Sequence, residues 1–244
     1  MKVPYVNLKK QYLSEKKYLN KIFDEVLFSG NYVGGKYVEN FENNIKKFCK
    51  TKYCVSLNSG TDALTMALHL LGVRRGDEVI TTPNSFIAST SVIVHLGAKP
   101  VFVDVLDDQN INPDLIESKI SKKTKVIMPV HLTGRVCKMD KIVKIAKKYK
   151  LKIVEDAAQA IGSRYNGMMS GSIGDVGCFS AHPLKNLNAI GDAGYFVTNN
   201  RKIASKARQL RNHGIEGRDK VVSFGFVSRM DNIQAAVLNL RLKK

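Results

Sequence analysis

The sequence has few of the residues that hold small secreted or metal-bound folds together. Its four cysteines are scattered, with neither CxxC spacing nor a paired histidine, so no disulfide framework and no metal site are predicted. Residues 1–10 lack the apolar core of a signal peptide, and no apolar run is long enough to span a bilayer. These absences predict a soluble, cytoplasmic protein with no membrane partner.

Acidic residues are also scarce. Asp and Glu number 21 against 39 Lys and Arg, which gives a formal net charge of +18. This balance raises the hypothesis of a nucleic-acid-binding module or of attraction to anionic membranes. The basic runs, however, lie at element ends or on one face of amphipathic helices such as 139–149, without interleaved aromatics. We therefore expect solvated surfaces and no nucleic-acid partner, with a charge that can attract phosphorylated substrates.

Strand and helix patterns alternate along the chain. Strands are predicted at 53–57, 78–82, 101–105, 125–130, 152–155, 177–180 and 195–198, and helices at 60–71, 86–96, 113–120, 139–149 and 201–212. This alternation predicts an α/β fold with a mostly parallel, seven-stranded sheet and helices on both faces. The last two strands have no helix between them and are expected to form a hairpin or an antiparallel edge. A Rossmann fold shares the alternation, but its GxGxxG fingerprint is absent.

One lysine stands where a reactive amine would be useful. Lys185 follows an apolar strand and a short polar turn, residues 179–184, and precedes the glycine-rich segment 191–194. A lysine attacks carbonyls when burial or nearby cations lower its pKa, and bonding to pyridoxal phosphate is a common use. Most lysines are simply solvated, so the surrounding motifs must support the interpretation.

A carboxylate and an amide follow another apolar strand. Asp156 falls at the strand's C-terminal end, the sheet edge at which ligands bind in open α/β folds. There it could keep a pyridine nitrogen protonated, and Gln159 could hydrogen-bond the phenolic oxygen of the same ring. A helix N-cap role for Asp156 is compatible with this function.

A third motif, residues 58–64, joins a strand to a helix. Gly60 and Thr61 would open the helix, where unpaired N–H groups and the helix dipole favour a phosphate. The hydroxyls of Ser59 and Thr61 would add donors. Taken alone, the motif is more typical of a plain capping turn.

Together these motifs resemble the DegT/DnrJ/EryC1/StrS family of pyridoxal-phosphate-dependent nucleotide-sugar aminotransferases, within aminotransferase fold type I. The resemblance covers nearly the whole chain and includes further collinear segments at 4–8, 29–35, 76–80, 100–104, 129–134 and 210–214. It implies pyridoxal 5'-phosphate (PLP) as cofactor and Lys185 as the catalytic lysine that bonds it. It also implies Asp156 on the ring nitrogen and Gln159 on the phenolic oxygen.

The remaining roles also follow from the resemblance. Gly60, Thr61 and Ser180 would bind the cofactor phosphate, and Phe86 would stack on the cofactor ring. Residue type alone favours a packed core position for Phe86. A related dehydratase branch has histidine at the position of Lys185, so the lysine favours amino transfer.

The family resemblance implies an activity as well. A nucleotide-linked keto-sugar would become an amino sugar with glutamate as donor, in the biosynthesis of lipopolysaccharide, another cell-surface polysaccharide or a glycoconjugate. The sequence GDAG at 191–194 is closer to branches that act at sugar carbon 3 than at carbon 4. Family members are homodimers, and we expect the same here.

Two departures from the family bear on activity. We expect residues 1–35 to form an N-terminal helix and substrate-loop arm and 36–244 the PLP-binding large domain, with the family's small C-terminal domain absent and the chain ending inside its last helix. A catalytically impaired PLP-binding protein is therefore the alternative to an active enzyme. The second departure is Val227, where the family often has an asparagine that reaches the partner's phosphate. Valine cannot donate that hydrogen bond, and Ser228 is the candidate replacement.

Overall fold

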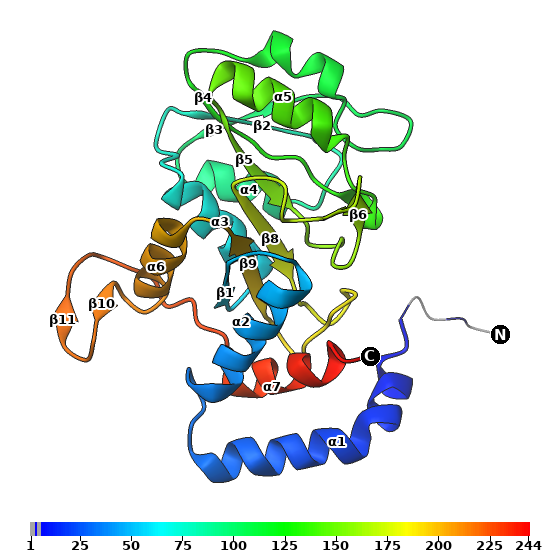
Figure 1. Cartoon of the computed structure of the whole chain (residues 1–244), viewed down its shortest axis with the longest axis vertical. Coiled ribbons are helices and arrows are strands. Elements are labelled where there is room, and N and C mark those ends of the chain that lie inside the picture. The colour runs from blue at the N-terminus through cyan, green and yellow to red at the C-terminus, as the bar shows by residue number, and fades with distance from the viewer. Residues whose placement is uncertain (1–2, 4–5) are drawn as a thin grey trace.

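The fold is built on one seven-stranded sheet (Figure 1). The computed structural model describes residues 3 and 6–244, so part of the motif at 4–8 lies outside the described residues. The strands run in the spatial order β1-β9-β8-β5-β4-β2-β3. Their bounds are β1 Tyr53–Leu57, β2 Glu78–Thr81, β3 Lys99–Phe102, β4 Thr124–Ile127, β5 Lys152–Asp156, β8 Val176–Ser180 and β9 Gly194–Thr198.

Strand directions confirm the mostly parallel sheet. Neighbouring strands from β8 to β3 pair in parallel, whereas β9 is antiparallel to both β8 and β1. The hairpin expected for the last two strands is therefore confirmed, but the alternative of an antiparallel edge is wrong. All five residues of β9 are buried, and such a strand needs a neighbour on each side to satisfy its backbone groups. The edge position belongs to β1.

Helices cover both faces of the sheet, as predicted. One face carries α3 (Gly60–Leu70), α4 (Ala88–His95) and α6 (Arg201–Leu210). The other face carries α2 (Lys36–Phe48), α5 (Met139–Tyr149) and α7 (Asn232–Arg241). The long helix α1 (Leu8–Ser29) lies outside this layer, alongside α7 (Figure 1). The last helix, α7, ends at Arg241, three residues before the last residue of the given sequence.

Local signals explain where the helices begin and which face they bury. The Ser59 hydroxyl caps α3 by accepting the Asp62 N–H at 3.0 Å, and Asn200 caps α6 in the same way. In α5 the apolar residues Ile142 and Ile145 face the core, while four of the six exposed positions carry lysines. Among the described residues, no helix is both long and apolar enough to cross a lipid bilayer.

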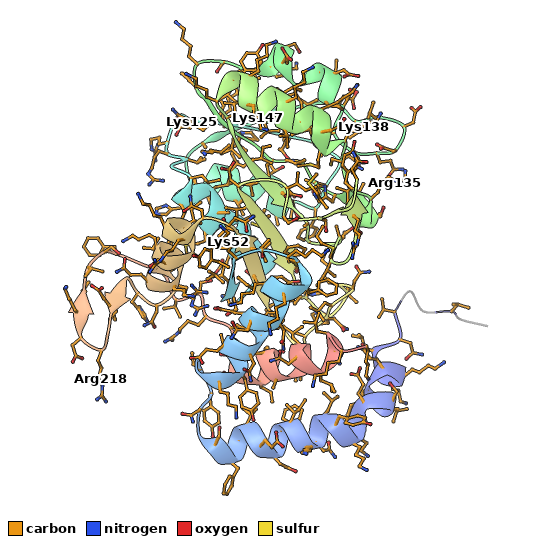
Figure 2. The ribbon with its side chains drawn as sticks, viewed as in Figure 1. Lys52, Lys125, Arg135, Lys138, Lys147 and Arg218 are labelled. Carbon is orange, nitrogen blue, oxygen red and sulfur yellow. The ribbon has the colours of Figure 1, made fainter. Side chains whose placement is uncertain are left out.

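The excess positive charge is spread over several elements. Of the six cations labelled in Figure 2, four lie around α5 at one end of the molecule, Lys125, Arg135, Lys138 and Lys147, and two lie elsewhere, Lys52 and Arg218. Lys52 precedes β1, Lys125 lies in β4, Lys147 lies in α5, and Arg135 and Lys138 lie in the segment before α5. Arg218 lies in the turn between β10 (Ile215–Glu216) and β11 (Lys220–Val221).

The helix predicted at 113–120 is wrong. The segment forms two 3-10 turns, η1 (Pro113–Leu115) and η2 (Glu117–Lys119). Its two buried side chains, Pro113 and Ile116, are three residues apart, a spacing that 3-10 geometry places on one side. Short elements complete the fold: η3 Leu132–Gly134, β6 Arg164–Tyr165 and β7 Met168–Met169.

Candidate active site

A pocket of about 660 Å³ opens where the parallel strands end at their carboxyl termini. This edge is the expected ligand site of an open α/β sheet, because the loops that follow neighbouring strands converge there. All seven site residues predicted from the sequence line this pocket: Gly60, Thr61, Phe86, Asp156, Gln159, Ser180 and Lys185. Residues up to 125 positions apart in the chain are thus brought to one cavity.

One end of the pocket is formed by the start of α3. The helix begins at Gly60, as predicted, and the first N–H groups of a helix have no intrahelical acceptor. Gly60 is pressed against the end of β8, where an added Cβ would lie 2.6 Å from the Ser180 Cβ. Gly194 is equally constrained, because a Cβ there would lie 2.1 Å from the Ser59 carbonyl carbon. The two glycines let the helix N-terminus and the Ser180 hydroxyl lie at one corner of the pocket, an arrangement with the donors that an anion requires.

Asp156 lies at the pocket floor with a side chain held by two hydrogen bonds. The Ser89 hydroxyl donates to Oδ2 at 2.7 Å, and the Ala158 N–H donates to Oδ1 at 3.2 Å. Asp156 is 5% exposed. A carboxylate has about four acceptor sites, so these two bonds fix its orientation and leave capacity for a ligand N–H. The sequence analysis did not identify Ser89, although a small polar residue on the apolar face of a helix is a signal for such a contact.

Gln159 is held so that its donor end is available. Its Oε1 accepts the Thr133 N–H at 2.8 Å. Since a backbone N–H can only donate, the atom facing Thr133 must be the oxygen, and the NH₂ group is left for another acceptor. In this orientation the Gln159 NH₂ group can donate a hydrogen bond to an oxygen atom of a ligand.

Lys185 reaches the pocket from the loop between β8 and β9. Burial lowers the pKa of its ammonium group below the ordinary value of 10.5, and the nearby Asp156 carboxylate opposes that shift without cancelling it. The neutral amine is the form that attacks carbonyl carbon. Lys185 therefore has the environment of a nucleophile and proton acceptor.

Phe86 is a rim residue of the pocket and is 70% exposed. The core position that residue type alone favoured is therefore wrong. The helix predicted from residue 86 begins only at Ala88, so Phe86 lies in the turn before α4, which carries its ring away from the core. An exposed ring at a pocket mouth is free to stack on a flat ligand.

A buried histidine beneath the pocket had no role in the sequence analysis. The Cys137 N–H donates to His131 Nδ1 at 3.3 Å, so Nε2 carries the hydrogen that contacts Glu155 at 2.9 Å. Glu155 also accepts three backbone N–H groups of the segment 171–174. His131 lines the pocket, and this network fixes its ring. The motif at 129–134 contains this residue, but no local pattern connects it to Glu155.

The replacement suggested for the family asparagine is not supported. Val227 is 58% exposed, whereas Ser228 is buried and its hydroxyl donates to Asn58 Oδ1 at 3.3 Å within the same chain. Because Ser228 is turned inward, it cannot extend to a partner's phosphate. Its contact instead fastens the segment before α7 to the loop that leads into α3.

Comparison with known proteins agrees with this geometry. The model of the DegT/DnrJ/EryC1/StrS aminotransferase family matches residues 14–244. The chain is 42% identical to the dTDP-3-amino-3,6-dideoxy-alpha-D-galactopyranose transaminase of Aneurinibacillus thermoaerophilus, over 98% of this chain and 66% of the relative. It is 40% identical to the 3-oxo-glucose-6-phosphate:glutamate aminotransferase of Bacillus subtilis, over 90% of this chain and 50% of the relative.

A solved structure has the same fold as this chain. The crystal structure of ntda from Bacillus subtilis with bound cofactor PMP (pyridoxamine phosphate) superposes with a TM-score of 0.93 at 38% identity, covering 99% of this chain and 56% of that chain. This chain spans 64–66% of the length of three curated relatives that it matches. From its sequence, its fold and the arrangement of its pocket, the chain belongs to the DegT/DnrJ/EryC1/StrS aminotransferase family.

Proposed function

We propose that the protein is a PLP-dependent aminotransferase that converts a nucleotide-linked keto-sugar into an amino sugar, with glutamate as the amino donor. One observation carries the proposal. Lys185, the Asp156 carboxylate and the N-terminus of α3 lie around one pocket of about 660 Å³, and burial lowers the pKa of that lysine. Family membership and the names of the relatives support the same activity.

The residues present fit the cofactor. A phosphate group needs N–H and hydroxyl donors in a confined space, and Gly60, Thr61 and Ser180 supply them where an added Cβ at position 60 would clash. Asp156 would hold the protonated ring nitrogen, and the NH₂ group of Gln159 would donate to the phenolic oxygen. Phe86 would cover the ring from the pocket mouth. Bound PLP supplies an electron sink for the negative charge that develops when a substrate C–H bond loses its proton.

The chain's own part in amino transfer centres on Lys185. Its Nζ would hold the cofactor covalently and would accept and return the substrate proton. A pKa lowered by burial keeps more of this amine unprotonated near neutral pH than an exposed lysine would have. The Ser89 and Ala158 bonds keep Asp156 in one orientation, so the carboxylate needs no rearrangement as charge develops.

We propose carbon 3 of the sugar as the position of amination. The names of the Aneurinibacillus thermoaerophilus and Bacillus subtilis relatives both specify position 3, and the latter also names glutamate. The GDAG segment favoured the same position. Because the Bacillus subtilis enzyme is named for a sugar phosphate, the assay should offer phosphorylated and nucleotide-linked 3-keto sugars side by side.

We also propose that the protein is a homodimer. The segment after β11 exposes apolar side chains to solvent, with Phe224 100% and Val227 58% exposed. It follows the β10–β11 hairpin, which projects from the body of the molecule (Figure 1). Contiguous exposed apolar residues mark interfaces. Sedimentation of Phe224→Ser should show dissociation, whereas Phe28→Ser, an equally exposed control on α1, should not. Sedimentation of the unaltered protein as a monomer would contradict the proposal.

The cofactor site is tested on this chain directly. PLP is titrated while the visible absorption is recorded, the product is reduced with borohydride, and the modified peptide is mapped. We expect the adduct on Lys185 and its loss in Lys185→Ala, while the exposed-lysine control Lys147→Ala retains it. An adduct elsewhere, or none in a folded chain, contradicts the assignment.

Turnover is tested separately, because relatives are longer than this chain. Release of 2-oxoglutarate from glutamate is followed with 3-keto and 4-keto sugars. Ping-pong kinetics with the 3-keto substrate are expected. Turnover of only the 4-keto substrate would overturn the position, and PLP attachment without turnover would favour the impaired PLP-binding alternative.

A further inference from the structure

We propose that α1 positions the Lys185 loop from behind through Gln11 and Asn188, supported by the ion pair between Glu15 and Arg241. In this role Asn188 and Gln11 are positioning residues that act through the loop and touch no substrate. Their importance for amino transfer rests on the proposed function, but the mechanical role is a property of this chain alone.

The lysine loop is closed by its own backbone. Between β8 and β9, the Ala189 N–H donates to the Ala181 carbonyl at 2.7 Å, which brings the two ends of the loop together. Inside the closed loop, the Lys185 N–H donates to the His182 carbonyl at 2.8 Å. Leu184, Lys185 and its neighbours on this side line the pocket. The pocket side of the loop faces open space, so its position must be fixed from the opposite side.

Asn188 provides that fixation. It is 7% exposed, and its Nδ2 donates to the Pro183 carbonyl at 2.9 Å, two residues before Lys185. The same amide forms a reciprocal pair with Gln11 of α1: Nδ2 donates to Gln11 Oε1 at 3.0 Å, and Gln11 Nε2 donates to Asn188 Oδ1 at 3.1 Å. The Asn188 side chain therefore connects the lysine segment to a helix 177 residues earlier in the chain.

A second anchor lies one helical turn along α1. Arg241 of α7 donates through Nη1 to the carbonyls of Asn188 at 2.7 Å and Ala189 at 3.2 Å. Its Nε and Nη2 donate to Glu15 Oε2 at 3.0 and 2.8 Å, and Lys244 contacts the other oxygen at 2.9 Å. Because Gln11 and Glu15 are four residues apart, they lie on the same face of α1. Together they hold the C-terminal half of the loop at two points.

The contact between α1 and the rest of the chain is otherwise sparse. Of its 22 residues, only Glu15, Leu19 and Val26 are buried, and Figure 1 shows the helix running along the outside of α7. One of these three is a carboxylate whose partner reaches the lysine loop. The hydrogen bonds to the lysine loop are thus a large part of the contact between α1 and the rest of the chain. Removing them should alter the position of the loop while leaving the sheet intact.

The experiment uses the ligand-free chain and alanine variants. Lys185 is labelled with acetic anhydride over a range of pH, and its modification is quantified by peptide mass spectrometry against Lys147 in the same sample. The titratable groups that line the pocket around the amine are His131, Asp156, Cys178, His182 and Asp192. None of them is altered in these variants, so a changed labelling profile reports on the loop.

Asn188→Ala and Gln11→Ala are compared with a matched pair. The Asn239 side chain accepts a hydrogen bond from the Asn44 amide at 2.8 Å and donates one to the Tyr37 carbonyl at 3.0 Å. These contacts are of the same kind as those of Asn188, but they involve no residue of the lysine loop. We expect Asn188→Ala and Gln11→Ala to move the Lys185 labelling midpoint upward, toward that of Lys147. PLP binding should weaken by up to about tenfold, the equivalent of one lost hydrogen bond. Asn239→Ala and Asn44→Ala should leave both measurements unchanged.

The outcomes are distinct. An unchanged Lys185 midpoint in Gln11→Ala, the variant least able to disturb folding, overturns the proposal, and so does an equal shift in Asn239→Ala. If the unaltered chain fails to attach PLP to Lys185, the proposed function fails. The labelling profiles of the ligand-free chain still decide whether α1 positions the loop.

Discussion

The Ser89 hydroxyl donates a 2.7 Å hydrogen bond to Asp156, joining α4 to the end of β5 across 67 residues of sequence. Both groups are buried beside the pocket. The contact orients the carboxylate that we assign to the cofactor ring, and it links the rim turn carrying Phe86 to the pocket floor.

Ser89→Ala should weaken PLP binding by about tenfold, because a hydrogen bond to a charged group contributes about 1.5 kcal/mol or more. Titration of the visible absorption measures this. Ser91→Ala, on the same helix but bonded only to a backbone carbonyl, is the control and should bind PLP normally. Equal affinities for the two variants would remove Ser89 from the site.

Asp156→Asn should lower turnover far more than it lowers PLP affinity. The neutral amide keeps the shape of the side chain but cannot stabilise a protonated ring nitrogen, a contact that matters most as negative charge develops on the substrate. Steady-state kinetics and PLP titration, measured on the same preparation, separate the two effects. Parallel losses in both would show that Asp156 acts only in binding.

Covalent attachment of PLP should depend on pH in a way set by Lys185. Because burial lowers the pKa of its ammonium group, the reactive amine becomes available as pH rises through a value below 10.5. The attachment rate should therefore reach half its maximum at a lower pH than labelling of Lys147. Coincident profiles for the two lysines would contradict a buried, activated amine.

Glu42 should make the chain sensitive to acid. Burial alone raises the pKa of this carboxyl, but the charges of Arg211 and Arg208 and the Ser56 N–H together hold it below its ordinary value of 4.5. The unfolded state then binds more protons than the folded state in this range, so the free energy of unfolding falls as pH drops from about 4.5 through the folded-state value.

The matched variants for this effect are Glu42→Gln and Glu117→Gln. Glu42→Gln should cost about 2 kcal/mol of unfolding free energy at neutral pH, because it leaves half-buried arginines without their carboxylate, and should flatten the acid slope. Glu117 pairs with Lys148 at an exposed site, so its substitution should change little. Chemical denaturation at several pH values measures both, and equal losses would refute the role of Glu42.

Gly194→Ala should destabilise the fold by about 3 kcal/mol, since the new Cβ would meet the Ser59 backbone and neither strand nor helix start can move aside. Gly217→Ala is the control. It lies in open space at a positive φ of 68° and should cost only about 1 kcal/mol of conformational strain. Thermal unfolding of both variants measures the difference, and a mild effect at Gly194 would mean that the helix start can retreat from β9.

Local patterns in the sequence predicted the strands of the sheet, most of the helices that cover it and the position of the site. The period of apolar residues located all seven strands, and the capping residue Ser59 marked the start of α3. Because parallel strands present their carboxyl ends at one edge, residues that follow different strands, such as Asp156 and Ser180, could be expected to converge. The motifs around Lys185 were specific enough to indicate the family.

Tertiary structure alone decided how that site is held. Three hydrogen bonds join segments that are distant in the sequence: Ser89 to Asp156, His131 to Glu155 and Gln11 to Asn188. The local sequence indicates only that each of these polar groups needs a partner. Which partner is available depends on the packing of helices against the sheet over long separations in sequence. The same packing placed β9 inside the sheet and left the ring of Phe86 at the pocket mouth, because strand order and the exposure of a loop residue depend on contacts between distant segments.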